Sequence, residues 1–306
     1  MANYAIKTDN LVKIYSHKTV VDHVCMHVKE GSIYGFVGEN GSGKTTIMRL
    51  LMGLASPQSG SYSLFNVDNK DKKIYEQRKH ISAIVEAPSL VPSMNAYDNL
   101  HFACMYYGVK DLSIINEVLH LVGLENTGKK KVKNFSLGMR QRLGIAVLLL
   151  NKPKLMLLDE PMNGLDPAGI AQLRDLIISL NQKGITFLIS SHILSELEKV
   201  ATDYGFISHG RLIKEISAEE LQNASISGVE LSYDNHQALI NALDKLNIVD
   251  YTVIKQGMVK VTKYDNLIDL LILLRKEGIE ITNVNTRNEK VEDYYLDLIK
   301  GGHKNA

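Results

Sequence analysis

Residues 32–46 read Ser-Ile-Tyr-Gly-Phe-Val-Gly-Glu-Asn-Gly-Ser-Gly-Lys-Thr-Thr, and this stretch decides the fold. Residues 38–45 fit the pattern G-x-x-x-x-G-K-[ST]. The apolar run 32–37 before the pattern predicts a buried strand, and residues 45–54 after it predict a helix. Strand, glycine-rich turn and helix, in this order, are the context in which the pattern binds phosphate groups.

Each residue type in this loop has a physical reason for its place. Glycines permit positive φ angles, so successive backbone N–H groups can turn inward around an anion. The helix that follows points its positive end at the same place. Lys44 can reach the β- and γ-phosphates of a nucleotide, and the Thr45 hydroxyl can hold Mg²⁺. The residues expected to hold ATP are consecutive: Gly38, Glu39, Asn40, Gly41, Ser42, Gly43, Lys44, Thr45 and Thr46.

A second apolar strand, residues 155–158, ends in two carboxylates, Asp159 and Glu160. Placed beside the strand of the phosphate loop, it would bring Asp159 near Mg²⁺ and Glu160 near the γ-phosphate. Glu160 would then be the general base for the attacking water. A strand that ends in solvated acids is the alternative, but the loop upstream favours the catalytic interpretation.

A long helix is expected to begin at Ser136 and to run to Leu150. Ser136 would be its N-cap, which leaves backbone N–H groups and a positive helix end free to bind an anion. The pattern fits an ordinary helix start equally well. The functional alternative is a second phosphate clamp, used on the nucleotide of another subunit.

Strand-like and helix-like segments alternate through the first two thirds of the chain, and the strands are continuously apolar. This pattern predicts an α/β fold with a mainly parallel sheet. We expect this domain to span residues 1–216, with a helical subdomain at about 88–150. Further strands are expected at 81–85 and 185–190, and further helices at 95–107, 113–122 and 167–180.

The composition changes near residue 217. Residues 217–228 are polar and small and are expected to form a linker to a small C-terminal α+β domain, 229–306. The order β-α-β-β-α-β beyond it is that of a ferredoxin-like unit. Its strands are expected at 226–233, 249–255, 258–262 and 279–284, and its helices at 236–246 and 265–277, with a last amphipathic helix at about 291–299.

The charges are balanced: 35 Lys and Arg stand against 34 Asp and Glu in 306 residues, a formal net charge of +1. A dedicated nucleic-acid binder usually carries a basic excess, so no nucleic-acid partner is expected. The two cysteines, Cys25 and Cys104, predict no disulfide framework and favour a reducing compartment. We expect no signal peptide, and no run approaches the roughly 20 apolar residues of a membrane span.

Across about residues 4–216 the chain resembles the ATPases of ABC transporters. Residues 38–45 match the Walker A loop of that family, and residues 155–160 match Walker B with its catalytic glutamate. The ordered set of motifs is far more specific than any one of them. Three shorter motifs also match: Asn163-Gly164-Leu165-Asp166 as the D-loop, with Asp166; His192 as the switch histidine; and Tyr15 as the aromatic residue that stacks on adenine.

Residues 135–139, Phe-Ser-Leu-Gly-Met, resemble the signature loop of the family, whose usual sequence is Leu-Ser-Gly-Gly-Gln. Ser136 and Gly138 are kept, and these are the positions with which the family contacts the γ-phosphate. Phe135, Leu137 and Met139 depart from the pattern.

The resemblance implies a P-loop NTPase core, ATP and Mg²⁺ as cofactors, and two ATPase domains packed head to tail. Each ATP would lie between Walker A of one domain and Ser136, Gly138 and Met139 of the other. Glu160 would activate water and His192 would steady the γ-phosphate. One chain has one phosphate loop, so the second domain must come from another subunit, in a homodimer or a heterodimer. A separate permease would hold the pair at the cytoplasmic face of a bacterial membrane.

Glu86 stands where the family usually has the glutamine that touches Mg²⁺ and senses the permease. Glutamate there, Ser-Leu-Gly-Met in the signature and the tail 291–296 all resemble the branch that serves lantibiotic immunity and bacitracin export. The resemblance implies an exporter of a peptide or another amphiphile. A carboxylate cannot donate as an amide can, so we expect Glu86 to change coupling rather than ATP affinity.

Two other classes of protein stay open at this point. A soluble ABC-type ATPase that acts on ribosomes or nucleic acid usually has two ATPase units or long coiled-coil insertions, and neither is evident here. A regulator that does not hydrolyse ATP is disfavoured by the intact set Lys44, Asp159, Glu160 and His192.

Overall fold

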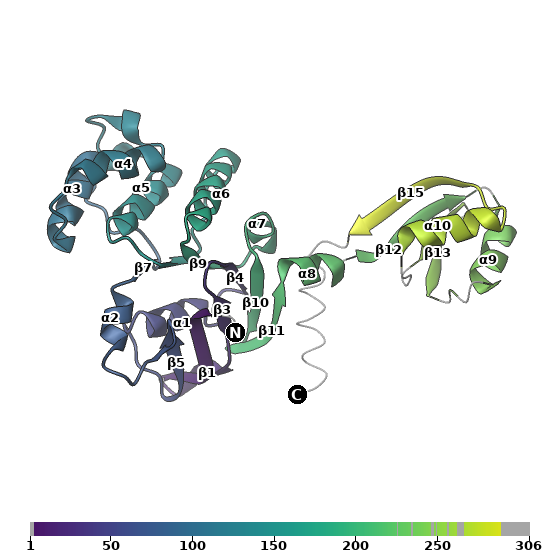
Figure 1. The fold of residues 1–306 in the computed structure, drawn as a ribbon, viewed down its shortest axis with the longest axis horizontal. Coiled ribbons are helices and arrows are strands. Elements are labelled where there is room, and N and C mark those ends of the chain that lie inside the picture. Colours follow the sequence, from purple (N-terminus) through teal and green to yellow (C-terminus); the bar gives the residue numbers. More distant parts are fainter. Residues whose placement is uncertain are drawn as a thin grey trace. The chain divides into compact units, whose positions relative to one another are not determined.

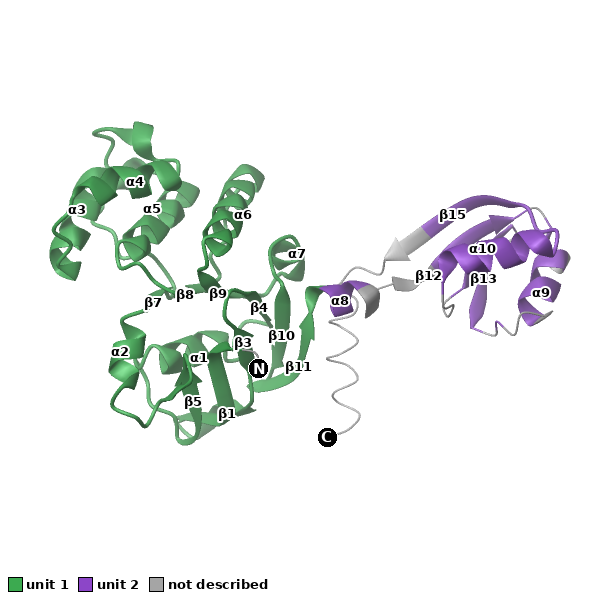
Figure 2. Cartoon of the chain, viewed as in Figure 1, with its two compact units in different colours: residues 1–218 green, residues 219–306 purple. Residues whose placement is uncertain are grey.

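The computed structural model describes residues 3–224, 226–233, 235–245, 248, 250–255, 257–261 and 266–288. The chain divides into two compact units, residues 1–218 and 219–306, which Figure 2 colours separately. The helix expected at 291–299 and the tail 291–296 lie outside the described residues. In the part of the chain that is described, no helix is long and apolar enough to cross a bilayer.

A six-stranded sheet forms the centre of the first unit, in the order β11-β10-β4-β9-β8-β7 (Figure 1). Five neighbouring strands run parallel, and only β11 is antiparallel to its neighbour. The strands are β4 (Ile33–Val37), β7 (Ile81–Ile84), β8 (Leu155–Asp159), β9 (Thr186–Ser191), β10 (Asp203–Ser208) and β11 (Arg211–Ser217). Every residue of β4, β8 and β9 is buried, which confirms the expected buried parallel sheet.

One expected neighbourhood is wrong. The strand that ends in Asp159 does not lie beside the strand of the phosphate loop, because β9 pairs with both β4 and β8 and separates them. The long helix α6 (Pro167–Gln182) carries the chain from β8 to β9, and this crossover returns the chain between the two strands.

A second, antiparallel sheet precedes the parallel one in the chain, and the sequence patterns did not predict it. Its order is β2-β1-β5-β6, and β3 also pairs with β1. Its strands are β1 (Tyr4–Tyr15), β2 (Lys18–Val24), β3 (His27–Lys29), β5 (Ser59–Leu64) and β6 (Val67–Asp68).

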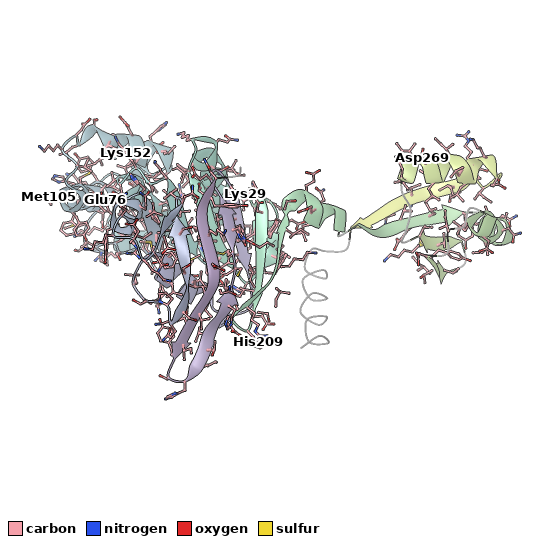
Figure 3. The ribbon with its side chains drawn as sticks, turned by 60° about the horizontal axis from the view of Figure 1, so that its bottom comes forward. Lys29, Glu76, Met105, Lys152, His209 and Asp269 are labelled. Atoms are coloured by element: carbon pink, nitrogen blue, oxygen red, sulfur yellow. The ribbon has the colours of Figure 1, made fainter. Side chains whose placement is uncertain are left out.

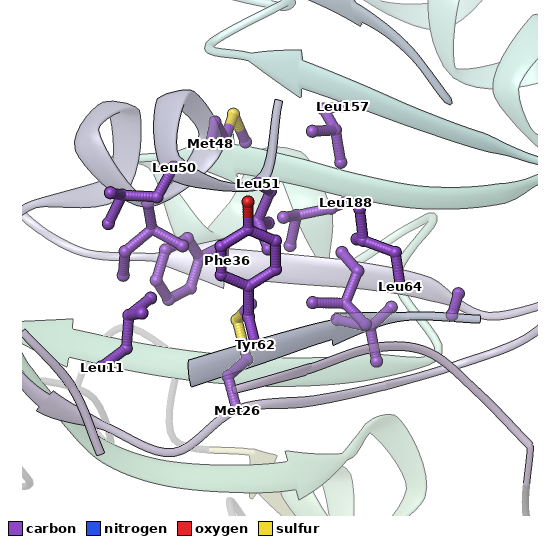
Figure 4. Packing of buried hydrophobic residues seen from close by; sticks show 14 of the residues in the cluster. Leu11, Met26, Phe36, Met48, Leu50, Leu51, Tyr62, Leu64, Leu157 and Leu188 are labelled. Atoms are coloured by element: carbon purple, nitrogen blue, oxygen red, sulfur yellow. The ribbon is translucent and has the colours of Figure 1, made fainter. Parts of the chain in front are cut away.

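Helix α1 (Lys44–Leu51) is buried between the two sheets. Met48, Leu50 and Leu51 of α1 belong to one apolar cluster with residues of both sheets (Figure 4). The sheet residues labelled in that figure include Leu157 and Leu188 of the parallel sheet and Leu11, Tyr62 and Leu64 of the antiparallel one. Burial of each such side chain is worth about 1.5–3 kcal/mol, so the helix that follows the phosphate loop is held rigidly from both sides.

The helical part of the unit lies between β7 and β8 in the chain and groups three helices together (Figure 1). These are α3 (Ala96–Tyr107), α4 (Ser113–Leu121) and α5 (Leu137–Leu149), close to the expected bounds. Asn95 caps α3 by accepting a hydrogen bond from Asp98 N, and Ser136 caps α5 by accepting one from Met139 N. The expected N-cap role of Ser136 is thereby confirmed. Two short helices, α2 (Ile74–Arg78) and α7 (Leu194–Leu197), complete the unit.

The second unit has its own four-stranded sheet, in the order β13-β14-β12-β15, with every pairing antiparallel. Its core is a separate apolar cluster that includes Leu231, Leu239, Val259 and Leu274. Its elements in chain order are β12 (Ile226–Tyr233), α9 (His236–Lys245), β13 (Tyr251–Lys255), β14 (Met258–Val261), α10 (Leu267–Lys276) and β15 (Ile281–Asn288).

The expected linker 217–228 is largely regular structure instead. Helix α8 (Ala218–Ala224) occupies its first half, and β12 begins at Ile226. Glu219 and Glu220 lie in the first turn of α8, where their negative charges stabilise the helix by interacting with the positive end of its dipole. The polar character of the segment therefore reflects an exposed helix start rather than an extended chain.

Candidate nucleotide-binding and hydrolysis site

The phosphate loop joins β4 to α1. At Gly43 its backbone has a conformation that only glycine adopts readily. Its φ angle is 109°, and a Cβ there would lie 2.7 Å from Val20 O. Gly38 and Ser42–Lys44 are buried, Glu39–Gly41 are exposed, and Thr45 and Thr46 are half-buried. Ser42 Oγ is buried without a hydrogen-bond partner among the described residues. A phosphate oxygen is a fitting acceptor for this hydroxyl.

Lys44 lies over the loop with its ammonium almost fully buried. Its Nζ donates hydrogen bonds to Gly38 O at 2.5 Å and to Glu39 O at 3.2 Å. The same nitrogen lies 3.3 Å from Glu160 Oε1. The cation thus bridges the phosphate loop and the expected catalytic carboxylate.

Asp159, at the end of β8, is held from two sides. Thr45 Oγ1 donates to Asp159 Oδ2 at 2.7 Å, and Ser190 Oγ donates to Asp159 Oδ1 at 2.5 Å. Ser190 Oγ also accepts a hydrogen bond from Glu160 N at 2.8 Å. Although β9 intervenes, Asp159 and Thr45 meet as expected, and Ser190 of β9 is the bridge. Hydroxyl and carboxylate oxygens are the donors that Mg²⁺ prefers.

Glu160 and His192 lie side by side. His192 Nδ1 is 2.7 Å from Glu160 Oε2, so an N–H at Nδ1 donates to the carboxylate. The other oxygen, Oε1, accepts no hydrogen bond from the described residues and is balanced only by the Lys44 charge. Glu160 has a φ angle of 48°, which is rare for a non-glycine residue and turns the chain sharply after β8. Oε1 can take a proton once Lys44 gives up its contact with it.

The signature residues lie at the start of α5. Ser136 is exposed, and its Oγ accepts the hydrogen bond from Met139 N at 3.2 Å. Gly138 and Met139 are half-buried in the first turn. Asp166 caps α6 in the same way, with Oδ1 accepting from Gly169 N at 2.9 Å. Both caps leave backbone N–H groups of the first helical turns available to an anion.

Glu86 follows β7 and is held by Arg49, whose Nη2 donates to Glu86 Oε1. Its φ angle is 73°, a second left-handed residue in the site. The Glu86 side chain is mainly exposed, and it lines a cavity of about 500 Å³ together with Pro88, Gln141 and Glu160. The partner Arg49 lies on α1, one and a half turns after Lys44, and the sequence patterns did not single it out.

Tyr15 is the last residue of β1 and is half-exposed. Lys13 Nζ lies 4.8 Å from the centre of its ring. Tyr15 pairs with Lys18 of β2, and Val20 of the same strand contacts the phosphate loop at Gly43. Tyr15 therefore lies on the β1–β2 hairpin, which flanks the phosphate loop.

Comparison with known families gives one match, the family described as ABC transporter, over residues 21–163. The chain is 41% identical to the bacitracin transport ATP-binding protein BcrA of Bacillus licheniformis over 302 residues, which is 97% of this chain and 98% of that protein. It is 44% identical to the lantibiotic transport ATP-binding protein SrtF of Streptococcus pyogenes over 218 residues, which is 71% of this chain and 93% of that protein.

Among solved structures, the chain resembles cbiO1 of Clostridium perfringens, described as part of the ABC transporter complex cbiONQ. The TM-score is 0.65 at 26% sequence identity, and the match covers 72% of this chain and 90% of that one. The covered share corresponds in size to the first unit.

Proposed function

Because this chain belongs to the family of ABC transporter ATP-binding proteins, we propose that it is the ATP-hydrolysing subunit of an exporter whose membrane-spanning part is a separate polypeptide. The chain is an ABC transporter ATPase that binds ATP. Its cargo, in this proposal, is a peptide antibiotic or a similar amphiphile. BcrA, which matches over nearly the full length, and SrtF are named for the transport of such compounds.

The contact between Glu160 and His192 beside Lys44 carries the hydrolytic part of the proposal. Glu160 Oε1 accepts no hydrogen bond from the described residues, and it takes the proton of the attacking water once Lys44 has given up its contact with it. The N–H of His192 holds the other oxygen, so the carboxylate keeps one orientation. Lys44 exchanges its contact with Glu160 for the negative charge of the terminal phosphate.

Mg²⁺ is proposed to be held by the hydroxyl of Thr45 and the carboxylate of Asp159, which already meet at 2.7 Å. When bound, the ion neutralises charge on the β- and γ-phosphates. Ser190 keeps the Asp159 carboxylate oriented by donating to its other oxygen. The exposed Tyr15 ring is proposed to stack on the adenine base.

A second ATPase subunit completes the proposed site. Ser136, Gly138 and Met139 would lie against the terminal phosphate of the ATP bound by the second subunit, at the positive end of α5. Asp166 belongs to the same proposed interface. A homodimer and a heterodimer satisfy this geometry equally.

Helix α3 offers the surface that we propose for the permease. Phe102, Met105 and Tyr106 are 53%, 63% and 83% exposed. Figure 3 shows Met105 at the outer edge of the helical part. Exposed apolar groups gathered on one helix are typical of interaction sites. Docking there would keep the ATPase at the cytoplasmic face of the membrane.

For the second unit we infer a ferredoxin-like fold. Its strand order β13-β14-β12-β15, with antiparallel pairing and one helix after the first strand and one after the third, is the arrangement of the split β-α-β unit. A role in the dimer and a role in regulation are both compatible with this fold.

Glu86 is proposed to couple ATP hydrolysis to the permease. Its bond with Arg49 ties the loop after β7 to α1, which begins at the phosphate loop. We predict that Glu86→Gln, which weakens this charge-assisted bond, lowers transport several-fold while the Kd for ATP stays within about twofold. ATPase rates of the assembled transporter and cargo resistance of cells measure the effect. Unchanged ATPase rate and unchanged transport would show that the substitution is neutral.

The experiment that tests the function is purification of the tagged chain from its native cells in mild detergent, with the accompanying proteins identified by mass spectrometry. A multi-span membrane protein in stoichiometric amount supports the transporter. Ribosomal proteins, or no membrane partner, contradict it and favour the soluble ABC-type ATPase. In parallel, Glu160→Gln should lower Mg-ATP hydrolysis by about 10²–10⁴ without loss of ATP binding, and an equal rate would refute the catalytic assignment.

A further inference from the structure

The turn after β9 connects the phosphate loop to the switch histidine through one residue. Ser191 ends β9 and is buried. Its backbone carbonyl accepts a hydrogen bond from Gly38 N at 3.2 Å. The next residue is His192, whose ring contacts Glu160. A change in the contacts of the Ser191 side chain therefore acts directly beside His192, the partner of Glu160.

The Ser191 hydroxyl closes a tight turn around His192. Ser191 Oγ accepts from Ile193 N at 3.0 Å. It also lies 3.0 Å from Ile193 O and 3.1 Å from Glu196 Oε2. A hydroxyl has only one proton to donate. An ionised carboxylate is the stronger acceptor, so the proton points to Glu196 while that residue is charged.

Glu196 is itself held firmly. It lies on α7, whose Leu194 and Leu197 are buried in the core. Burial raises the pKa of the Glu196 carboxyl above its ordinary value, while the Ser191 hydroxyl opposes that rise. Smaller effects on the pKa of Glu196 come from Glu160, which raises it, and from His192, which lowers it. Partial burial costs the charged Glu196 carboxylate free energy, and the hydrogen bond from Ser191 keeps the carboxylate in place.

We propose that Glu196 is a positioning residue for His192 and that it acts through Ser191 Oγ. The inference rests on the proposed role of His192 in hydrolysis. The hydrogen bond between Ser191 and Glu196 fixes the orientation of the Ser191 hydroxyl. The hydroxyl in turn fixes the backbone N–H of Ile193. Because Ser191 and Ile193 flank His192, they hold the His192 backbone at the distance from Glu160 that the structure shows. The phosphate loop is held through the Ser191 backbone, which no side-chain change removes.

The proposal predicts a specific kinetic pattern for the full-length chain. Glu196→Ala and Ser191→Ala should each lower kcat of Mg-ATP hydrolysis by about ten- to a hundredfold, the scale of a misplacement of about 1 Å. KM for ATP should change less than twofold. Glu196→Gln keeps an acceptor oxygen for the hydroxyl and should retain most of kcat. The double variant Ser191→Ala/Glu196→Ala should be no slower than the slower single variant.

Three controls separate positioning from damage. Glu198→Ala removes an exposed carboxylate from the same segment and should leave kcat unchanged. Thermal unfolding should be cooperative for every variant. In a His192→Ala background, adding Glu196→Ala should have no further effect on the residual rate, because the residue to be positioned is gone.

The outcomes are distinguishable. Unchanged kcat in Glu196→Ala, a parallel rise of KM, additive loss in the double variant, or failure of Glu196→Gln to restore the rate would each overturn the inference while the ATPase assignment stands. Absence of Mg-ATP hydrolysis by the unsubstituted chain and by Glu198→Ala would instead overturn the hydrolytic part of the proposed function, and this inference with it.

Discussion

At the scale of single residues, Ser190 joins the two acidic residues of the site. Its hydroxyl donates to Asp159 and accepts from Glu160 N, and the residue is completely buried. The site therefore depends on a strand that supplies neither the phosphate loop nor the carboxylates. A hydroxyl with two partners in the core is costly to remove, because both partners lose a hydrogen bond without access to water.

We expect Ser190→Ala to lower the free energy of unfolding by about 1–3 kcal/mol and to lower kcat of ATP hydrolysis. Urea unfolding followed by circular dichroism and a steady-state ATPase assay measure both effects. Ser179→Ala, which removes a half-buried hydroxyl that donates to Leu176 O within α6, is the matched control and should cost less than about 0.5 kcal/mol. Equal losses for the two variants would show that Ser190 has no special role.

Sequence alone predicted the residues of the site whose neighbours in the chain reveal them. Lys44, Thr45, Asp159 and Glu160 stand in local motifs, and the structure brings them within hydrogen-bonding or ion-pair distance. Ser190 and Arg49 could not be predicted in the same way. Their contacts join residues 31 and 37 positions apart, and no spacing rule exposes a pairing that depends on the order of strands.

At the scale of elements, the first unit is two sheets with α1 between them. The parallel sheet was predictable, because its strands are continuous apolar runs. The antiparallel sheet was not: β1 mixes buried and exposed residues without a regular period, and its pairings with β2 and β5 contain register shifts. Strand order also escaped prediction, since chain order does not determine which strand a crossover places next to which.

Strands β2 and β11 connect the two sheets at their edges. Asp22 N donates to Gly210 O at 2.8 Å, and Arg211 Nε donates to Asp22 Oδ2 at 2.6 Å. The hydrogen bonds from Arg211 and then His23 lower the pKa of Asp22 below 3.8. The charged form of Asp22 is thus favoured in the folded state, so its contribution to stability is present above that value and is lost as the pH falls through the lowered pKa.

We predict that Asp22→Asn lowers the free energy of unfolding at pH 7 by about 0.5–1 kcal/mol, the range of a partly exposed ion pair. The difference from the unsubstituted chain should persist down to about pH 5 and shrink below pH 3.8. Urea unfolding across this pH range measures it. Arg211→Gln removes the other partner of the pair and should show the same trend, whereas a difference independent of pH would exclude the charged pair as its source.

At the scale of the whole molecule, the chain consists of two units with separate apolar cores. Every residue proposed to bind or hydrolyse ATP lies in residues 1–218. SrtF is matched over most of its length by a segment no longer than this unit. All the residues that this chain is proposed to contribute to ATP binding and hydrolysis therefore belong to one unit.

We expect a fragment of residues 1–218 to fold alone and to keep ATP binding, with a Kd within about threefold of the full chain, because no site residue is removed. Circular dichroism, gel filtration and equilibrium nucleotide binding check the result. Residues 219–306 expressed alone should likewise show a cooperative unfolding transition. Aggregation of the 1–218 fragment under conditions in which the full chain is soluble would show that its core needs the second unit.

The half-exposed ring of Tyr15 marks a position at which a fluorescent side chain could report nucleotide binding. The chain has 14 tyrosines and no tryptophan, so Tyr15→Trp would place its sole indole at the proposed adenine contact. The emission of that fluorophore should change when ATP or ADP is added, and it should change equally in a Glu160→Gln background that cannot turn ATP over. Emission that does not respond to nucleotide would show that the adenine base does not bind at residue 15. A saturable change would let the emission report the fraction of molecules that have nucleotide bound.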